Sequence, residues 1–182
     1  MRSRYDVLVV GGGHAGAEAA AAAARAGVRT LLISPDLSRI GQMSCNPAIG
    51  GVAKGVVARE VDALGGVMGQ ATDASRIQFR MLNRSKGPAV WGPRAQCDRS
   101  MYPTVVRRVL DSLPMLDLFQ EMVADLLVDA GRVVGVRTRG GLEFVSECIV
   151  ITTGTFLRGR IHVGGEAGVE AGRAGEAPSV EL

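Results

Sequence analysis

The stretch Tyr5-Asp-Val-Leu-Val-Val-Gly-Gly-Gly-His-Ala-Gly16 decides the fold class of this chain. Residues 5–10 form a short aliphatic run, typical of a strand that is buried on both faces of a parallel sheet. The glycines that follow have the spacing Gly11-x-Gly13-x-x-Gly16, which is the dinucleotide-binding fingerprint. The first glycine permits a tight turn, the second lets backbone approach a pyrophosphate, and the third lets helix and strand pack closely. We therefore predict a nucleotide-binding β-α-β unit.

The next residues supply the helix and the second strand of this unit. Residues 15–26 are almost wholly alanine, Gly27 stands where a C-cap glycine belongs, and residues 28–33 are aliphatic again. The acid that usually binds the ribose at the end of the second strand is absent, since Ser34 occupies its place and Asp36 is the nearest acid. Ribose binding is left to Ser34, to backbone, or to Asp36 from a bent loop. A plain NAD-dependent dehydrogenase is the least favoured enzyme class.

Periodicity and turn residues predict the other elements. We expect residues 5–10, 28–33 and 148–152 to share one parallel sheet, and the meander 116–146 to be antiparallel. A loop is expected before Gly51. The remaining expectations are a helix at 52–64 with one apolar face, a half-buried strand at 77–82, a helix from Asp98 or Ser100 to Leu113, meander strands at 116–119, 122–128, 132–139 and 142–145, and loop or poorly ordered chain at 164–182.

Composition restricts the class of protein. A chain of 182 residues has the length of one domain, and its 25 glycines follow no Gly-X-Y period. Four Phe, two Tyr and one Trp leave little for a nucleic-acid surface that stacks bases on rings. No run of about 18 apolar residues and no signal-peptide pattern is present, so we expect a cytoplasmic protein without a membrane segment. Cys45, Cys97 and Cys148 lack the spacing of a disulfide framework or a zinc site, and no metal is expected.

Charge and one cysteine mark two further candidate regions. The basic segment, residues 76–108, carries eight cations against the single anion Asp98, whereas the rest of the chain has 13 cations and 17 anions. Such a segment is either a polyanion-binding face or the commoner kind of charged face, which is solvated or internally paired. Cys45 lies in the glycine-rich loop that follows the second strand, where ligands bind in open α/β sheets. A helix starting near Gly51 would lower the pKa of this thiol, and the alternative is an inert loop cysteine.

Several strings together resemble one family. GGGHAGAEAA, GQMSCNPAIGG, IQFRMLNRSKGPAV, RAQCDR, TTGTFLRG and GRAGEAPS are similar to the MnmG family, also called GidA, and the likeness runs through essentially all 182 residues. The resemblance implies a Rossmann-like FAD-binding fold of the two-dinucleotide-binding flavoprotein type, α/β with a parallel sheet and an antiparallel β-meander, incomplete relative to the full-length family. Residues 1–163 would be the N-terminal part of the FAD-binding domain. The alternative is a truncated nucleotide-binding remnant without independent catalytic activity.

The resemblance also implies an activity and a set of site residues. The family adds an aminomethyl or carboxymethylaminomethyl group to C5 of the tRNA wobble uridine, with FAD, NADH and methylene-tetrahydrofolate, a GTPase partner called MnmE, and a homodimer in the full-length protein. The 182-residue chain by itself is expected to be inactive. Cys45 is the candidate catalytic residue, or else it packs against the flavin. The implied FAD contacts are Gly11, Gly12, Gly13, His14 (through its backbone), Ala15, Gly16, Val123 (through its backbone, to adenine) and Ser179.

Overall fold

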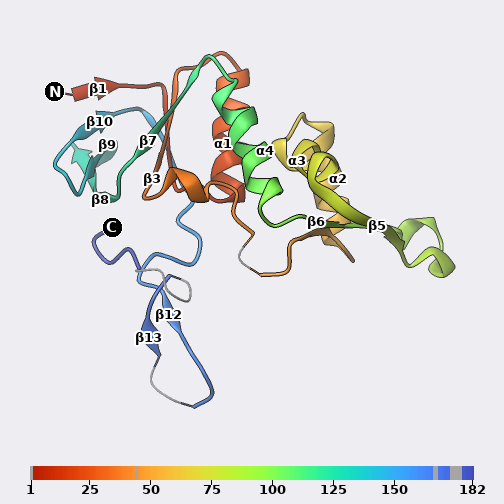
Figure 1. Ribbon diagram of the computed structural model, residues 1–182. Helices are drawn as coiled ribbons and strands as arrows, with labels where there is room; N and C mark the ends of the chain where they lie inside the picture. The colour runs from red at the N-terminus through yellow and green to blue at the C-terminus, as the bar shows by residue number, and fades with distance from the viewer. Residues whose placement is uncertain (1, 44, 166–167, 173–177) are drawn as a thin grey trace.

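A parallel sheet forms the centre of the computed structural model, which describes residues 2–43, 45–165, 168–172 and 178–182. Its strand order is β11-β2-β3-β7, and all neighbours are parallel (Figure 1). The strands are β2 (Val7–Val10), β3 (Thr30–Ser34), β7 (Leu116–Gln120) and β11 (Cys148–Ile151). The three runs expected to share a parallel sheet do so, because Val7 pairs with both Thr30 and Cys148.

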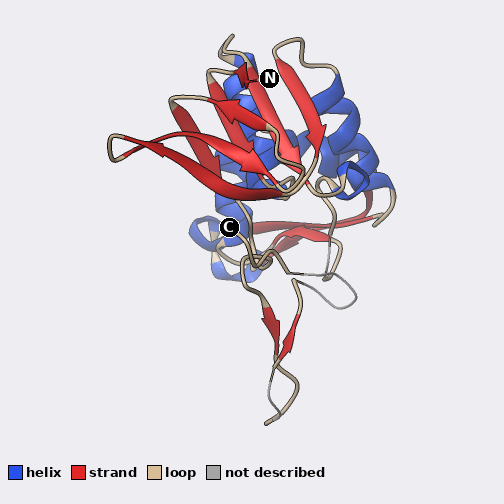
Figure 2. Ribbon diagram, turned by 90° about the vertical axis from the view of Figure 1, so that its left-hand side faces the viewer, coloured by secondary structure: helices blue, strands red, loops and turns tan. Residues whose placement is uncertain are grey.

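Alternation along the strands divides the core between the two faces of this sheet. Val9 and Leu32 face α1 (His14–Arg25) and α4 (Met101–Asp111), and the alanines of α1 allow it to lie close to the strands. Leu8 and Ile33 face the opposite side. Figure 2 shows the helices gathered on one side of the sheet and further strands on the other. The predicted helix at 98–113 is confirmed, with the Asp98 carboxylate accepting from the N–H groups of the Ser100 and Met101 backbone.

A second sheet covers the other face, in the order β1-β10-β9-β8. Its strands are β1 (Arg2–Arg4), β8 (Val123–Asp129), β9 (Arg132–Thr138) and β10 (Glu143–Val145). The meander β8-β9-β10 is antiparallel as expected, and β1 joins it in parallel with β10. Val136 and Phe144 pack from this sheet onto Leu8 and Leu31. The result is a helix–sheet–sheet sandwich.

The meander begins later than predicted. The strand at 116–119 exists, as β7, but it pairs with β3 in the parallel sheet, with Leu116 opposite Thr30. The physical reason is the helix that precedes it. A strand entered directly from α4 completes a β-α-β crossover onto the sheet that α4 covers. The helix expected to end at Leu113 already indicated that the next strand would join the parallel sheet. The antiparallel assignment of residues 116–119 was therefore wrong.

Residues 48–97 form a third unit, which protrudes beside the sandwich (Figure 1). It contains β4 (Ala48–Gly50), β5 (Arg76–Leu82) and β6 (Gly92–Cys97) in the antiparallel order β4-β6-β5, with α2 (Lys54–Ala63) and α3 (Val67–Ser75). The loop expectation before Gly51 was wrong at β4, which gains backbone partners from β6. The sequence did not predict α3 or β6. Residues 76–80 are exposed on both faces of the strand rather than half buried, and the predicted apolar face of α2 leaves Val56 and Val57 exposed.

Short helical turns and one small hairpin complete the described chain. The 3-10 turns are η1 (Leu37–Arg39), η2 (Arg84–Lys86) and η3 (Pro88–Val90), and the hairpin is β12 (Arg160–Ile161) with β13 (Val169–Glu170). The expectation of loop at 164–182 therefore fails at β13. Ser179 bridges to Leu157, whereas residues 173–177 of the GRAGEAPS string lie outside the described residues. In the described chain no helix is long and apolar enough to cross a membrane.

Candidate dinucleotide-binding site

A pocket of about 160 Å³ opens at the carboxyl ends of β2, β3 and β11. The turn after β2 forms its floor, the turns after β3 and β11 form two walls, and the β7–β8 connection closes a third side. This is the edge at which open α/β sheets bind ligands. Its lining consists of Val10, Gly11, Gly12, Gly13, Ile33, Ser34, Pro35, Asp36, Arg39, Gln42, Glu121, Met122, Val123, Thr152, Thr153, Gly154, Phe156, Ser179 and Leu182.

The glycine turn is held by the end of a distant strand. Gly11 has φ +105°, which side-chain-bearing residues rarely adopt. The Thr152 hydroxyl, just past β11, lies 2.9 Å from the carbonyl oxygens of both Val10 and Gly11. A β carbon at Gly16 would overlap the Gly11 carbonyl oxygen and come within 2.7 Å of Thr152 Oγ1. Gly16 therefore has the close-packing role that the fingerprint assigns to the third glycine.

Gly13 faces open space instead. It is the N-cap of α1 with φ −71°, and a β carbon there would meet nothing within 4 Å. Gly13 is also one of the residues that line the pocket. The first N–H groups of a helix have no partner within the helix, and they carry partial positive charge. The turn thus offers an uncovered helix N-terminus to an anionic group.

The turn after β3 brings an acid to the pocket wall, although the last residue of β3 is Ser34 and not an acid. The acid is Asp36, two residues farther along the chain. Ser34 is buried, and its Oγ lies against Gly12, where a β carbon would approach it to 2.9 Å. Asp36 lines the pocket, and its carboxylate accepts from the Ser38 N–H at 2.8 Å and from the Ser38 hydroxyl at 2.6 Å. The Ser38 donors and the Arg39 guanidinium, 3.1 Å away, hold the pKa of Asp36 below its ordinary value. Asp36 is therefore a fixed, ionised acceptor at the pocket wall.

The third side is made where β7 turns into β8. The Glu121 N–H donates to the Ser34 carbonyl at 3.0 Å, and the Arg139 N–H donates to the Met122 carbonyl at 2.8 Å. These bonds tie the turn to both sheets. Val123 follows, buried at the start of β8. Ser179 reaches the pocket through its bridge to Leu157, with its N–H on the Phe156 carbonyl.

The structure thus brings together most of the residues that the sequence assigned to a nucleotide. Gly11, Gly12, Gly13, Val123 and Ser179 all line the pocket. The remaining three, His14, Ala15 and Gly16, form the first turn of α1 and do not line it. The His14 ring lies away from the pocket, 5.6 Å from the buried Tyr102 ring.

Cys45 lies apart from this pocket. It is exposed, and its carbonyl accepts from the Arg99 guanidinium at 2.5 Å. The strand β4 lies between Cys45 and α2, which begins at Lys54, three residues after Gly51. The helix N-terminus invoked for the thiol is therefore farther along the chain than the sequence suggested. Within the described chain, no group of three or more His, Cys, Asp or Glu is placed to hold a metal ion.

Sequence reasoning missed several lining residues. Thr152 and Glu121 take their places from tertiary contacts, and neither carries a local motif. A signal existed for Thr152, because a strand that ends in Thr-Thr-Gly beside the first strand must bring polar groups to the same sheet edge. Arg39 reaches the pocket because it is the last residue of η1, whose N-cap is Asp36. The Asp36-x-Ser38 pattern that caps this turn could have been recognised in the sequence.

The sandwich and the glycine-turn pocket define the chain as a Rossmann-type protein with the fold of FAD-dependent flavoproteins. A probable FAD-dependent monooxygenase of Pseudomonas aeruginosa has this fold, with a TM-score of 0.56 and 17% identity over 81% of this chain and 42% of its own. A family model described as Glucose inhibited division protein A matches residues 6–182, so the chain belongs to the GidA family.

Two nearer relatives agree with this assignment. The tRNA uridine 5-carboxymethylaminomethyl modification enzyme MnmG of Phocaeicola vulgatus is 54% identical over all of this chain, which spans 29% of that enzyme's length. The crystal structure of Aquifex aeolicus GidA matches 99% of this chain and 30% of its own, with 51% identity and a TM-score of 0.94. The chain thus spans somewhat under a third of the length of these two relatives.

Proposed function

We propose that this chain is the FAD-binding portion of a flavin-dependent enzyme that modifies the wobble uridine of tRNA. The observation that carries the proposal is the opening in front of Gly13. Gly13 lines the pocket at the N-terminus of α1, and a β carbon there would enter open space. Such a cradle fits a pyrophosphate, which needs N–H donors and room for close approach.

The remaining walls suit the adenosine half of FAD. Asp36 supplies an ionised acceptor for ribose hydroxyls, which Ser34 does not do as well because its hydroxyl packs against Gly12. The buried start of β8 offers Val123 backbone to an adenine edge, and Ser179 and the Thr153-Gly154 turn lie on the far side. The first-turn residues His14, Ala15 and Gly16 would contribute their N–H groups.

The chemistry belongs to the complete enzyme. FAD supplies electron transfer when bound, and the family resemblance assigns NADH as reductant, methylene-tetrahydrofolate as carbon source, tRNA as substrate and the MnmE GTPase as partner. The same resemblance supports a homodimer and a cytoplasmic location. Because the chain spans 29% of its Phocaeicola relative, we expect nucleotide binding, and no modification activity, from these 182 residues.

Cys45 stays the candidate nucleophile of that chemistry. C5 of a uridine becomes nucleophilic after a thiolate adds to C6, so the enzyme needs a thiolate or a substitute for one. The exposed position of Cys45 makes the thiol accessible to a macromolecular substrate. Cys45 is not among the residues that line the pocket, so we do not assign it a contact with the adenosine half of FAD.

Titration of the chain with FAD and with FMN tests the cofactor. We expect FAD to bind and quench its fluorescence, and FMN to bind far more weakly because it lacks the adenosine half that the pocket fits. Gly13→Val should abolish FAD binding without unfolding the chain. Gly165→Val is the matched control, since a β carbon there also meets nothing within 4 Å but lies outside the pocket. Equal binding of FAD by the Gly13→Val and Gly165→Val chains would refute the proposed site.

A further inference from the structure

The β5–β6 hairpin gathers cations that have no anionic partner. Of the basic segment, Arg76 pairs with Asp73 and Arg107 with Asp111. Within the described chain, no carboxylate is in ion-pair distance of the four cations of the hairpin and its tip. These are Arg80, Arg84, Lys86 and Arg94. Internal pairing, one of the explanations of the charge cluster, therefore does not account for this hairpin, and a solvated face and a polyanion-binding face are the explanations left.

Two of these cations oppose each other directly. Arg80 on β5 is the register partner of Arg94 on β6. Side chains of directly opposed residues lie about 5 Å apart at their β carbons, and like charges in this position destabilise a sheet. The next pair on the same face, Gln78 with Gln96, is polar, and Gly50 of β4 stands beside Arg94. This sheet face is therefore a cationic surface, and a bound anion would offset the repulsion between Arg80 and Arg94.

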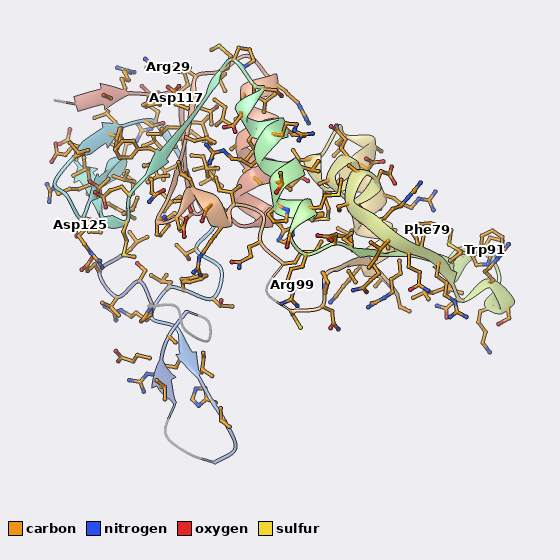
Figure 3. The ribbon with its side chains drawn as sticks, in the orientation of Figure 1. Arg29, Phe79, Trp91, Arg99, Asp117 and Asp125 are labelled. Carbon is orange, nitrogen blue, oxygen red and sulfur yellow. The ribbon has the colours of Figure 1, made fainter. Side chains whose placement is uncertain are left out.

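The exposed aromatic rings belong to the same hairpin. Phe79 and Trp91 are 54% and 39% exposed, and no other Phe, Tyr or Trp of the described chain is exposed. Figure 3 shows both on the hairpin that extends from the body of the protein. The Trp91 indole N–H donates to the Arg84 carbonyl at 3.3 Å, so the ring is held in place before any ligand arrives. The exposed rings thus belong to the hairpin that carries the unpaired cations, although strand alternation places Phe79 on the sheet face opposite Arg80 and Arg94.

We infer that the β5–β6 hairpin is a docking surface for single-stranded RNA, in which Arg80 and Arg94 bind phosphates and Trp91 stacks on an unpaired base. Phosphates at regular spacing neutralise opposed arginines, and exposed rings stack on bases only where these are not paired. An acidic peptide would neutralise the arginines but would offer no base to stack on the exposed rings. The inference rests on the proposed function, because a tRNA-modifying enzyme must hold an unpaired anticodon loop.

Fluorescence anisotropy on the 182-residue chain tests this docking surface. The probes are a labelled RNA stem-loop with a uridine in its unpaired loop, a fully paired RNA duplex of equal length, and polyglutamate. We expect the chain to bind the stem-loop best, with affinity that falls steeply as salt rises. R80E/R94E should weaken stem-loop binding at least tenfold and reduce the salt slope by roughly 0.7–0.9 for each phosphate that is no longer neutralised. The charge-matched control R108E/R132E lies outside the hairpin and should change affinity less than threefold.

Two single substitutions separate RNA contact from folding. R80E places opposite charges across the two strands, so we expect its Tm to rise by about 1–3 °C while RNA affinity falls. W91A should weaken stem-loop binding about fivefold or more and leave duplex binding unchanged, and W91F should restore it. If these residues had only a structural role, the RNA affinity of each variant would rise and fall with its Tm.

Three results would overturn the inference: no binding of the stem-loop by the wild-type chain, equal effects of R80E/R94E and R108E/R132E, or polyglutamate binding as tight as RNA binding. FAD titration of the same samples keeps the two proposals apart. FAD binding without hairpin-dependent RNA binding refutes only the docking surface, and the converse refutes only the cofactor assignment.

Discussion

Gly16→Ala and Gly13→Ala, three residues apart in one motif, should have opposite consequences. At Gly16 the new methyl group would overlap the Gly11 carbonyl oxygen and push on the Thr152 hydroxyl at 2.7 Å. Overpacking of this kind costs about 1–3 kcal/mol, and displacing the Thr152 hydrogen bond costs about 1 kcal/mol more. Alanine recovers roughly 1 kcal/mol through its higher helix propensity. The net loss is about 1–3 kcal/mol, or roughly 2–12 °C in Tm.

At Gly13 the same methyl group enters open space and the backbone is already extended. Alanine gains about 0.4–1 kcal/mol by restricting the unfolded chain and loses a few tenths of a kcal/mol or more at the N-cap. Stability should therefore change by less than about 0.5 kcal/mol, whereas FAD binding should be lost because the methyl group stands where the pyrophosphate lies.

Urea denaturation followed by circular dichroism, together with FAD titration, measures both quantities. A Gly13→Ala chain that loses as much stability as Gly16→Ala would show that the pocket in front of Gly13 is not open in solution. A Gly13→Ala chain that binds FAD like the wild type would show that the pyrophosphate lies elsewhere.

Three further predictions address other parts of the molecule. Cys45→Ser in a complete protein should abolish tRNA modification at unchanged flavin content; normal modification would remove Cys45 from the mechanism, and lost flavin would reassign it to cofactor packing. Burial, followed by the hydrogen bond to Asp117, raises the pKa of Tyr5. The protonated phenol therefore stabilises the folded chain fully below pH 10.0, and this contribution to the free energy of unfolding is lost as the pH rises further. Tyr5→Phe should cost about 1 kcal/mol at neutral pH and flatten the decline of Tm in alkali; an equally steep decline would contradict this. Glu18 accepts from the Val67 and Met68 N–H groups at 2.9 and 2.7 Å, so Glu18→Ala should cost about 1–2 kcal/mol in urea denaturation; an unchanged midpoint would show that α3 does not depend on this cap.

The central part of the fold could be predicted because its determinants are local. Buried strands of a parallel sheet are continuous aliphatic runs, and residues 7–10 and 148–151 pair with the register that such a sheet requires. The fingerprint then fixed the position of the pocket at the end of β2. Three of its four lining glycines, Gly11, Gly12 and Gly13, were accordingly named from the fingerprint.

The failures have tertiary causes. The α3 helix begins at Val67, and its N-cap residue Gly66 has no side chain to cap it; the first N–H groups donate instead to Glu18 of α1. The partner of β7 was misassigned because alternation identifies a strand but not its neighbour. The apolar spacing of α2 did indicate a helix, although it did not indicate burial, since Val57 stays exposed. Glu121 is brought to the pocket by the contact of its N–H with the Ser34 carbonyl of a strand distant in sequence, and no pattern near Glu121 indicates that contact.

The position of β2 between β3 and β11 has a consequence during synthesis. The second edge of β2 is paired only after β11 has been synthesised, and the Gly11 carbonyl receives its hydrogen bond only after Thr152 has been synthesised. A nascent chain that has emerged only as far as α4 therefore carries the whole fingerprint on an apolar strand with one open edge, which is a hazard for misassociation. We expect nucleotide binding to arise late on the ribosome, when β11 inserts, and not when the fingerprint itself appears.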